Sequence, residues 1–340
     1  MTVSVIIPIY RSENTISACI DSVLGQSFTD LELIMVDDGS PDECGKICDD
    51  YAARDGRIKV VHQQNKGRSE ARWNGVKIAN GEWVCFVDSD DTLPHSALSL
   101  LCGSISDTTD IVFGNGYTLS GEKRQSIPMA DFRHLAVRGE GTIGVPWGSL
   151  YRRSVLTNWM FDVPRHIYNG EDYLFWLRLV FSTERPVVVV YESVYNKGEE
   201  HTSNKFSWTA DYCYELNELR KSSIPVELEN EYLADMIDDR LANMFAVAIC
   251  QSKQKWQNNR YYQDILEDMR NKDVFIMQTS SKAINDNLME TYLKADASRR
   301  MGARKVVAIM PNFPYARQER KVEHGEPISA RLNMSLLHSS

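Results

Sequence analysis

Short apolar runs and amphipathic stretches alternate along the first part of the chain. Runs rich in β-branched residues predict strands at residues 3–10, 31–40, 58–63 and 82–88. Helical spacing of apolar positions predicts a helix at residues 13–25, and a further helix is expected at residues 69–79. The polar stretch that follows residue 40 predicts another helix, which ends at about residue 54. Ser69 is the expected cap of the last of these helices. Strands alternating with helices predict an α/β fold with a mostly parallel sheet covered by helices on both faces.

The pattern becomes mixed after about residue 100. Strand-like runs and helical spacing still occur, at residues 110–117, 170–182 and 185–196. A polar stretch with an apolar helical stripe follows, and a separate strand-helix-strand pattern comes after it, at residues 272–278, 286–300 and 305–311. We therefore expect three parts, at residues 1–207, 208–270 and 271–340.

Acidic residues gather where two predicted strands end. Asp37-Asp38 ends one strand, and Asp88, Asp90 and Asp91 end another. The carboxyl ends of parallel strands lie at one edge of a sheet, which is where ligands bind in such folds. Clustered carboxylates repel one another unless water or a cation compensates them. Mg²⁺ or Mn²⁺ with a diphosphate suits these oxygen ligands, whereas a solvated turn with helix-capping aspartates is the structural alternative.

Composition excludes several classes of function and location for this protein. The chain of 340 residues has a net charge of -9, which argues against a general nucleic-acid binder. Its seven cysteines are scattered without zinc-site spacing, as in proteins with reduced thiols. No signal-like segment opens the sequence, and no apolar stretch approaches the roughly 20 residues that span a bilayer. These features predict a cytoplasmic protein, with peripheral attachment to the inner face of a membrane left open.

Three segments resemble the family 2 inverting glycosyltransferases of GT-A fold. They are "VSVIIPIYRSENTISACIDSVLGQSFTDLELIMVDDGSPD", "NKGRSEARWNGVKIANGEWVCFVDSDDTL" and "GEDYLFWLRL". The resemblance covers residues 1 to about 205. It implies a metal-dependent enzyme that moves a sugar from a nucleotide-sugar, expected to be a UDP-sugar, to a saccharide or lipid-linked acceptor in surface polysaccharide synthesis. A nucleotide-binding scaffold whose C-terminal unit recruits a partner is the alternative hypothesis.

The resemblance also implies roles for individual residues. It places the nucleotide-sugar against Pro8, Tyr10, Glu13, Asp38, Gly67, Arg68, Arg72, Asp88 and Ser89, with Asp38 accepting a hydrogen bond from uracil. It assigns the Mg²⁺ or Mn²⁺ ion to Asp90, Asp88 and His201. Asp172 is the implied catalytic base, whose structural alternative is compensation of a helix N-terminus. Trp147 and Glu171 are implied on the acceptor side.

A second resemblance lies near the end of the chain. The motifs "NDNLME", "YARQER" and "EPISA", within residues 272 to about 335, resemble part of the N-terminal half of ribose-phosphate pyrophosphokinase. The resemblance implies that Arg317 and Gln318 border an ATP-like ligand. The other motifs of that enzyme are missing, so we expect a docking or homo-oligomerisation module, a vestigial nucleotide site or the result of a gene fusion. Basic residues exceed acidic ones between 294 and 331, which would suit an anionic membrane or a phosphate-rich acceptor.

Overall fold

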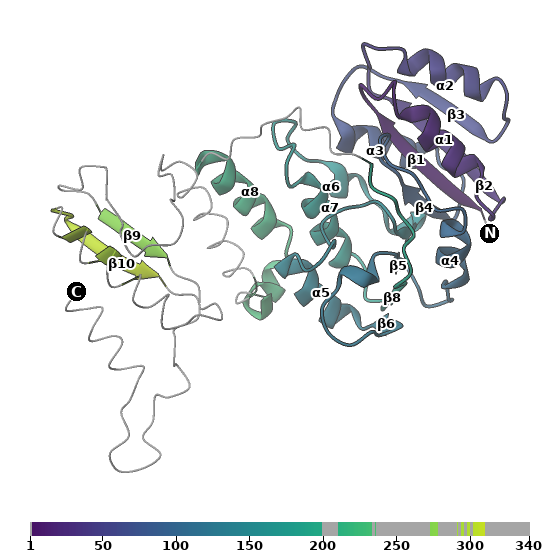
Figure 1. Ribbon diagram of the computed structural model, residues 1–340. Coiled ribbons are helices and arrows are strands. Elements are labelled where there is room, and N and C mark those ends of the chain that lie inside the picture. The colour runs from purple at the N-terminus through teal and green to yellow at the C-terminus, as the bar shows by residue number, and fades with distance from the viewer. Residues whose placement is uncertain are drawn as a thin grey trace. The chain divides into compact units, whose positions relative to one another are not determined.

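The computed structural model forms two compact units, residues 1–239 and 240–340. The residues that the structure describes are 2–198, 210–232, 235, 273–277, 291, 294, 295, 298, 299 and 302–309 (Figure 1). Three residues with expected roles lie outside them: His201, Arg317 and Gln318.

A mostly parallel sheet of eight strands runs through the described part of the first unit. Its strands are β1 (Val3–Ile9), β2 (Leu31–Asp37), β3 (Ile58–His62), β4 (Trp83–Phe86), β5 (Ile111–Phe113), β6 (Ser126–Ile127), β7 (Leu150–Arg152) and β8 (Val187–Val189). They are ordered β3-β2-β1-β4-β7-β5-β8-β6. β1 to β4 are parallel to one another, whereas β7 is antiparallel to β4 and β5, and β6 is antiparallel to β8.

Helices cover both faces of this sheet, which confirms the predicted fold class. They are α1 (Ile16–Leu24), α2 (Cys44–Ala52), α3 (Arg68–Ile78), α4 (Ala97–Gly103), α5 (Met129–Arg138), α6 (Asn158–Phe161) and α7 (Glu171–Val180), and a further helix, α8 (Ala210–Ser222), packs on α7. Successive strand residues point to opposite faces, so Val5 and Ile7 join the core under α1, α2 and α4, while Ile6 joins the core under α3, α5, α6 and α7 (Figure 1). Short 3₁₀ turns lie at Gly116–Thr118, Arg153–Val155 and Val226–Leu228.

The start of α3 differs from the prediction. Its N-cap is Gly67, with φ of 94°, and Arg68 is the first helical residue, so Ser69 is not the cap. Glycine takes this left-handed conformation without strain. Because Gly67 has no side chain, no side-chain hydrogen bond caps the helix, and the first backbone N–H groups of α3 are left for other partners.

The two strands predicted at residues 110–117 and 185–196 are shorter than expected. β5 ends at Phe113 instead of residue 117, and the 3₁₀ turn at Gly116–Thr118 follows it. β8 spans Val187–Val189 within the predicted run 185–196. The chain after β8 leaves the sheet and reaches the loop that follows β4, where Asn196 and Thr92 form an isolated bridge.

The second unit contains a strand pair where one was predicted. β9 (Asp273–Met277) and β10 (Lys305–Ile309) are parallel, with Asp273 opposite Lys305. Residues 291, 294, 295, 298 and 299 between them are helical. Among the described residues of the chain, no helix is both long enough and apolar enough to cross a membrane.

Candidate active site

The aspartates that follow β4 are held in different ways. Asp91 is buried, and its two carboxylate oxygens accept hydrogen bonds from the Tyr195 hydroxyl and the Gly198 backbone N–H, both at 2.7 Å. The partly exposed Asp90 carboxylate has no hydrogen-bond partner in the part of the chain that the structure describes. Asp90 is therefore the member of this group that is free to bind a ligand or a cation.

Arg72 links two of the predicted functional carboxylates. Its Nη2 donates to Asp88 Oδ1 at 2.8 Å, and its Nη1 donates to Asp172 Oδ1 at 2.6 Å. The arginine is only 2% exposed. Burial opposes its charged form, but the charges of Asp172 and Asp88 outweigh that effect and raise the pKa of Arg72. The segment after β4 and the first turn of α7 are thus joined through one guanidinium.

Asp38 holds the loop that leads into α3. This aspartate is 3% exposed, and its Oδ1 accepts hydrogen bonds from Gln63 Nε2 at 2.7 Å and the Lys66 backbone N–H at 2.8 Å. Its Oδ2 accepts one from the Gly67 backbone N–H at 2.8 Å. A carboxylate offers about four lone-pair positions. Three are used here by protein donors, and the predicted hydrogen bond from uracil to Asp38 stays a prediction.

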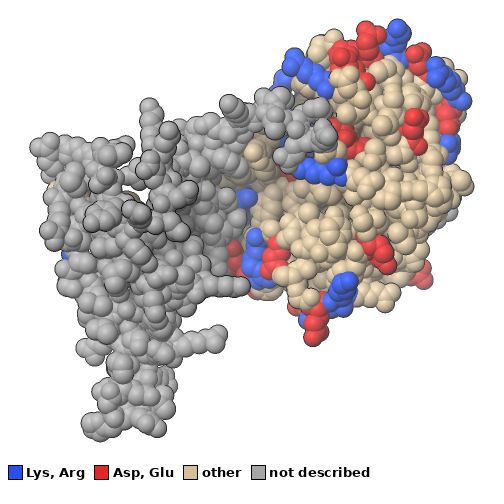
Figure 2. Space-filling model, in the orientation of Figure 1, with Lys and Arg blue, Asp and Glu red and all other residues tan. Residues whose placement is uncertain are grey.

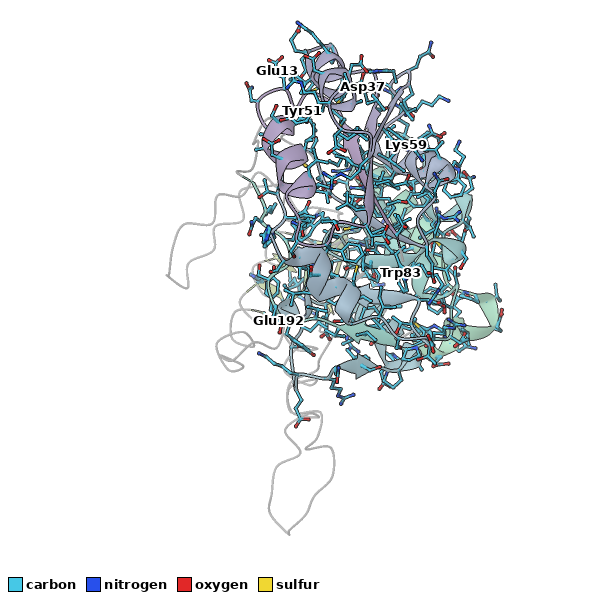
Figure 3. All side chains as sticks on the ribbon, turned by 90° about the vertical axis from the view of Figure 1, so that its right-hand side faces the viewer. Glu13, Asp37, Tyr51, Lys59, Trp83 and Glu192 are labelled. Carbon is cyan, nitrogen blue, oxygen red and sulfur yellow. The ribbon has the colours of Figure 1, made fainter. Side chains whose placement is uncertain are left out.

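The loop after β1 lies at the same end of the sheet. Pro8 is buried within β1, whereas Tyr10 is 43% exposed and lies under the Arg11 guanidinium, 5.3 Å from the ring centroid. Arg11 has a φ of 56°, which non-glycine residues adopt at a cost. Figure 3 labels Glu13, from this loop, and Asp37, from the end of β2, at one end of the unit. The strand ends are thus brought together as the topology predicts.

Two further predicted residues have partners that restrict them. The Ser89 hydroxyl pairs with the Ser12 hydroxyl at 2.6 Å, which ties the segment after β4 to the loop after β1. The Trp147 ring stacks on Tyr195, with centroids 4.3 Å apart and planes at 15°. One face of Trp147 is therefore covered by protein, and the residue packs against the core under α1, α2 and α4.

Glu171 begins α7 beside a pocket of about 340 Å³ that it helps to line. Its Oε1 accepts a hydrogen bond from Arg68 Nε, and Arg68 also donates to the Tyr168 carbonyl oxygen at 3.1 Å. The residue is 3% exposed, and its Oε2 has no hydrogen-bond partner among the described residues. Burial, followed by the charge of Asp172, raises the pKa of Glu171.

The residues that the sequence did not single out are those that orient the predicted ones. Tyr195 and Gly198 bind Asp91, and Gln63 binds Asp38. Tyr195 lies within an expected strand, and nothing in its local pattern relates it to an aspartate 104 residues away. The aspartates themselves were identifiable because strand ends and acidic clusters are visible locally.

The surface of the first unit mixes both charges. On the face drawn in Figure 2, acidic and basic side chains are interspersed, with neutral surface between them. No continuous basic surface is seen on the described part of this face.

Comparison with known proteins assigns the two parts of the chain differently. Residues 4–164 match the model of the family described as glycosyl transferase family 2. An uncharacterized glycosyltransferase of Bacillus subtilis strain 168, EpsJ, is 36% identical over 208 residues, covering 57% of this chain and 60% of the relative. The crystal structure of S. aureus TarS in complex with UDP-GlcNAc has a TM-score of 0.57 at 23% identity, with 75% of this chain and 76% of that chain covered. At that identity the likeness shows the fold alone.

The C-terminal part matches a different family. Residues 226–340 match the model of the N-terminal domain of ribose phosphate pyrophosphokinase, so the match begins before the expected boundary at 271. The ribose-phosphate pyrophosphokinase of Clostridium acetobutylicum is 35% identical over 103 residues, covering 30% of this chain and 32% of that enzyme. The expected resemblances are both confirmed. Residues 4–164 are thus similar to glycosyl transferase family 2, and residues 226–340 are similar to the N-terminal domain of ribose phosphate pyrophosphokinase.

Proposed function

We propose that the protein transfers a sugar from a UDP-sugar, with inversion and with the help of a divalent cation, to a hydroxyl of a saccharide or lipid-linked acceptor. The observation that carries the proposal is the linkage made by Arg72. The buried guanidinium of Arg72 binds both Asp88 and Asp172. Asp88 is close in sequence to the free Asp90, and Asp172 belongs to α7. A carboxylate that binds the donor and the catalytic base must both lie near the anomeric carbon of the donor sugar. The TarS complex with UDP-GlcNAc supports a UDP-sugar as the donor.

The residues around Asp90 fit a cation that is shared with the substrate. Among the described residues, no group of three or more His, Cys, Asp or Glu could hold a metal alone. Mg²⁺ is commonly bound by one or two carboxylates together with substrate phosphates and water. Asp90 would supply the free carboxylate, while Asp88 is engaged by Arg72. A bound cation would offset the charge of the leaving diphosphate.

Asp172 is suited to accept the proton of the acceptor hydroxyl. Its Oδ1 is held by Arg72, and its Oδ2 makes no hydrogen bond within the part of the chain that the structure describes. The free oxygen can therefore face a hydroxyl while the other fixes the carboxylate. In transfer with inversion the hydroxyl attacks the anomeric carbon from the face opposite the diphosphate, and its proton passes to Oδ2. We assign Arg72 to positioning, because its buried guanidinium is already used by two carboxylates.

Calorimetric titration of UDP, with and without Mn²⁺, tests the donor and cation site. We expect Mn²⁺-dependent UDP binding that Asp90→Ala abolishes. Glu192→Ala is the matched control, because Glu192 is exposed and Figure 3 labels it far from Glu13 and Asp37. Absence of UDP binding to the wild-type protein in both conditions would overturn the proposal.

Release of UDP from UDP-glucose, UDP-galactose and UDP-GlcNAc tests the base. We expect Asp172→Asn to retain UDP affinity and to lose turnover by about 10²-fold to 10⁴-fold, the usual contribution of a general base. The alternative hypothesis of a nucleotide-binding scaffold is favoured by the match at residues 226–340. It predicts UDP binding without turnover in the wild-type protein, and turnover of any of the three donors would exclude it.

A further inference from the structure

α7 begins at a bend formed by Asn169 and Gly170. Gly170 is the N-cap of the helix, with φ of 106°, and no side chain caps the helix. Asp172, the proposed base, lies two residues after this glycine. Because the main chain at a glycine can take many conformations, the direction in which α7 leaves the bend depends on contacts from other segments.

The side chains of α3 supply one set of these contacts. Arg72 donates a hydrogen bond to the Asp172 carboxylate, and Arg68 donates one to the Glu171 carboxylate. These hydrogen bonds hold two side chains of the first turn of α7. They do not involve the backbone of residues 169–170, so the bend itself is left to another element.

The backbone of the bend is bound by α8, which packs on α7 (Figure 1). The Tyr212 hydroxyl donates to the Asn169 carbonyl oxygen at 2.8 Å and accepts from the Asn169 backbone N–H at 2.9 Å. One hydroxyl thus binds both polar backbone groups of a single residue. Burial raises the pKa of Tyr212 above its usual 10, so the hydroxyl keeps the proton that it donates.

A second residue of α8 packs against the glycine of the bend. A Cβ atom at Gly170 would lie 2.9 Å from Leu216 Cδ2. Leu216 is 3% exposed and forms a small apolar cluster with Ile167, before the bend, and Leu174, within α7. Tyr212 and Leu216 are four residues apart and therefore lie on the same side of α8. This side of α8 contacts the chain before, at and after the bend.

The other end of α7 is held by different residues. Arg178 Nε donates to Ser223 Oγ at 3.3 Å. The Tyr232 ring packs on the Phe181 ring, with centroids 5.4 Å apart. These contacts stabilise α7 without touching its first turn. They allow a loss of stability to be separated from a displacement of Asp172.

We propose that Tyr212 and Leu216 are positioning residues for sugar transfer, which fix the bend at residues 169–170 and thereby hold Asp172 at the reacting hydroxyl. This rests on the proposed function, because it takes Asp172 as the base. Neither residue needs to touch a substrate, since each acts through the main chain at the start of α7.

The proposal gives α8 a role that neither family match covers. The two matches end at residue 164 and begin again at residue 226, and α8 lies between them. The transferase would therefore need residues 210–222 for the position of its base.

Release of UDP from UDP-glucose, UDP-galactose and UDP-GlcNAc by the full chain and its variants tests this assignment. Tyr212→Phe keeps the ring and removes only the hydroxyl. We expect it to lower kcat roughly tenfold, because the base is displaced, while the KM for the donor and the affinity for UDP change less than about twofold. Leu216→Ala should act in the same direction, and Leu216→Met, which nearly preserves the volume, should retain most of the turnover.

Ser223→Ala is the matched control for stability. It removes a hydroxyl that binds α7 at Arg178, at the other end of the helix. We expect it to lower the midpoint of urea denaturation about as much as Tyr212→Phe does, with kcat unchanged. Hydrogen–deuterium exchange of peptides that span residues 168–172 gives a second measurement, and it should accelerate in Tyr212→Phe but not in Ser223→Ala.

The outcomes separate this proposal from the proposed function. If the wild-type protein turns over a donor, an unchanged kcat or unchanged exchange at residues 168–172 in Tyr212→Phe would overturn the positioning role alone. An equal loss of kcat in Ser223→Ala would assign the effect to overall stability and would also overturn it. A raised donor KM in Tyr212→Phe with kcat unchanged would place this residue at the donor instead. Absence of turnover in the wild-type protein would contradict the proposed function, and the positioning role would fall with it.

Discussion

The Arg72 guanidinium donates a hydrogen bond to Asp172 at 2.6 Å, across a sequence separation of 100 residues. The contact joins α3 to the first turn of α7, and a second hydrogen bond from the same guanidinium reaches Asp88. The arginine was expected to contact the nucleotide or its phosphates. That contact stays a prediction, since the exposed fraction of Arg72 is 2% and two of its nitrogens are already occupied.

Replacing Arg72 should destabilise the fold as well as the site. Arg72→Met removes the positive charge at similar length and leaves Asp88 and Asp172 uncompensated, so we expect a loss of about 3–5 kcal/mol in the free energy of unfolding. Arg72→Lys keeps one charge but cannot bridge both carboxylates, and it should lose less. Urea denaturation monitored by circular dichroism measures both. Equal stability of Arg72→Met and the wild-type protein would contradict this account of the linkage.

The Tyr195 hydroxyl should contribute to stability because it joins two polar groups of the segment after β4. That hydroxyl donates to Asp91 and accepts from the Asp88 backbone N–H at 3.0 Å, so Tyr195→Phe leaves two polar groups without this partner. We expect a loss of about 1–3 kcal/mol. Tyr191→Phe is the control, because its hydroxyl accepts a single bond from the exposed Arg124 N–H, and a change of about 0.5 kcal/mol is expected. Thermal denaturation of the two variants compares them directly.

Gly198 should be essential to the position of Asp90. A Cβ atom at Gly198 would lie 2.1 Å from the Asp90 carbonyl oxygen, a backbone atom that must move to admit it. We expect Gly198→Ala to weaken Mn²⁺-dependent UDP binding and to lower stability by about 1–3 kcal/mol. Gly103→Ala, where a Cβ atom meets nothing within 4 Å, should be neutral or slightly stabilising. Unchanged UDP affinity in Gly198→Ala would show that the segment adapts.

The stability of the unit should depend on pH through His62. Its Nδ1 lies 2.9 Å from Asp37 Oδ2 and its Nε2 lies 3.1 Å from Asp49 Oδ1. The hydrogen bonds to Asp37, and then to Asp49, raise the pKa of His62 above its usual 6.5. The protonated form is therefore favoured in the folded state, so the stabilisation is complete below about pH 6.5 and is lost as the pH rises through the higher folded value.

Chemical denaturation at a series of pH values checks this dependence. The difference in unfolding free energy between the wild-type protein and His62→Gln should be largest at mildly acidic pH and should shrink towards alkaline pH. Asp49→Asn removes one of the two carboxylates and should move the loss to lower pH. A difference that stays constant across the series would exclude a charged His62 as its source.

The sequence was most informative where the determining interactions are local. Alternation and acidic strand ends located β1 to β4 and the aspartates, because the period of a strand and the charge of its last residues are read within about ten positions. For Arg72, in contrast, the neighbouring sequence predicts only that the residue is in a helix. Its ion pair with Asp172, 100 residues away, cannot be read from that neighbouring sequence. Gly67, and not Ser69, is the N-cap of α3, and its backbone N–H donates to Asp38, which follows β2. Partners contributed by distant segments are what local patterns do not contain.

The order of strands in the sheet also bears on how the chain is made. β1 to β4 are adjacent and parallel and are complete by residue 86, but the second edge of β4 pairs with β7, which begins at Leu150. Chains emerge from the ribosome with the N-terminus first. Until Leu150 has been synthesised, β4 has an open edge of the kind that pairs with other chains. The growing polypeptide therefore passes through a stage at which chaperone protection matters more for this domain than for one whose sheet closes in sequence order.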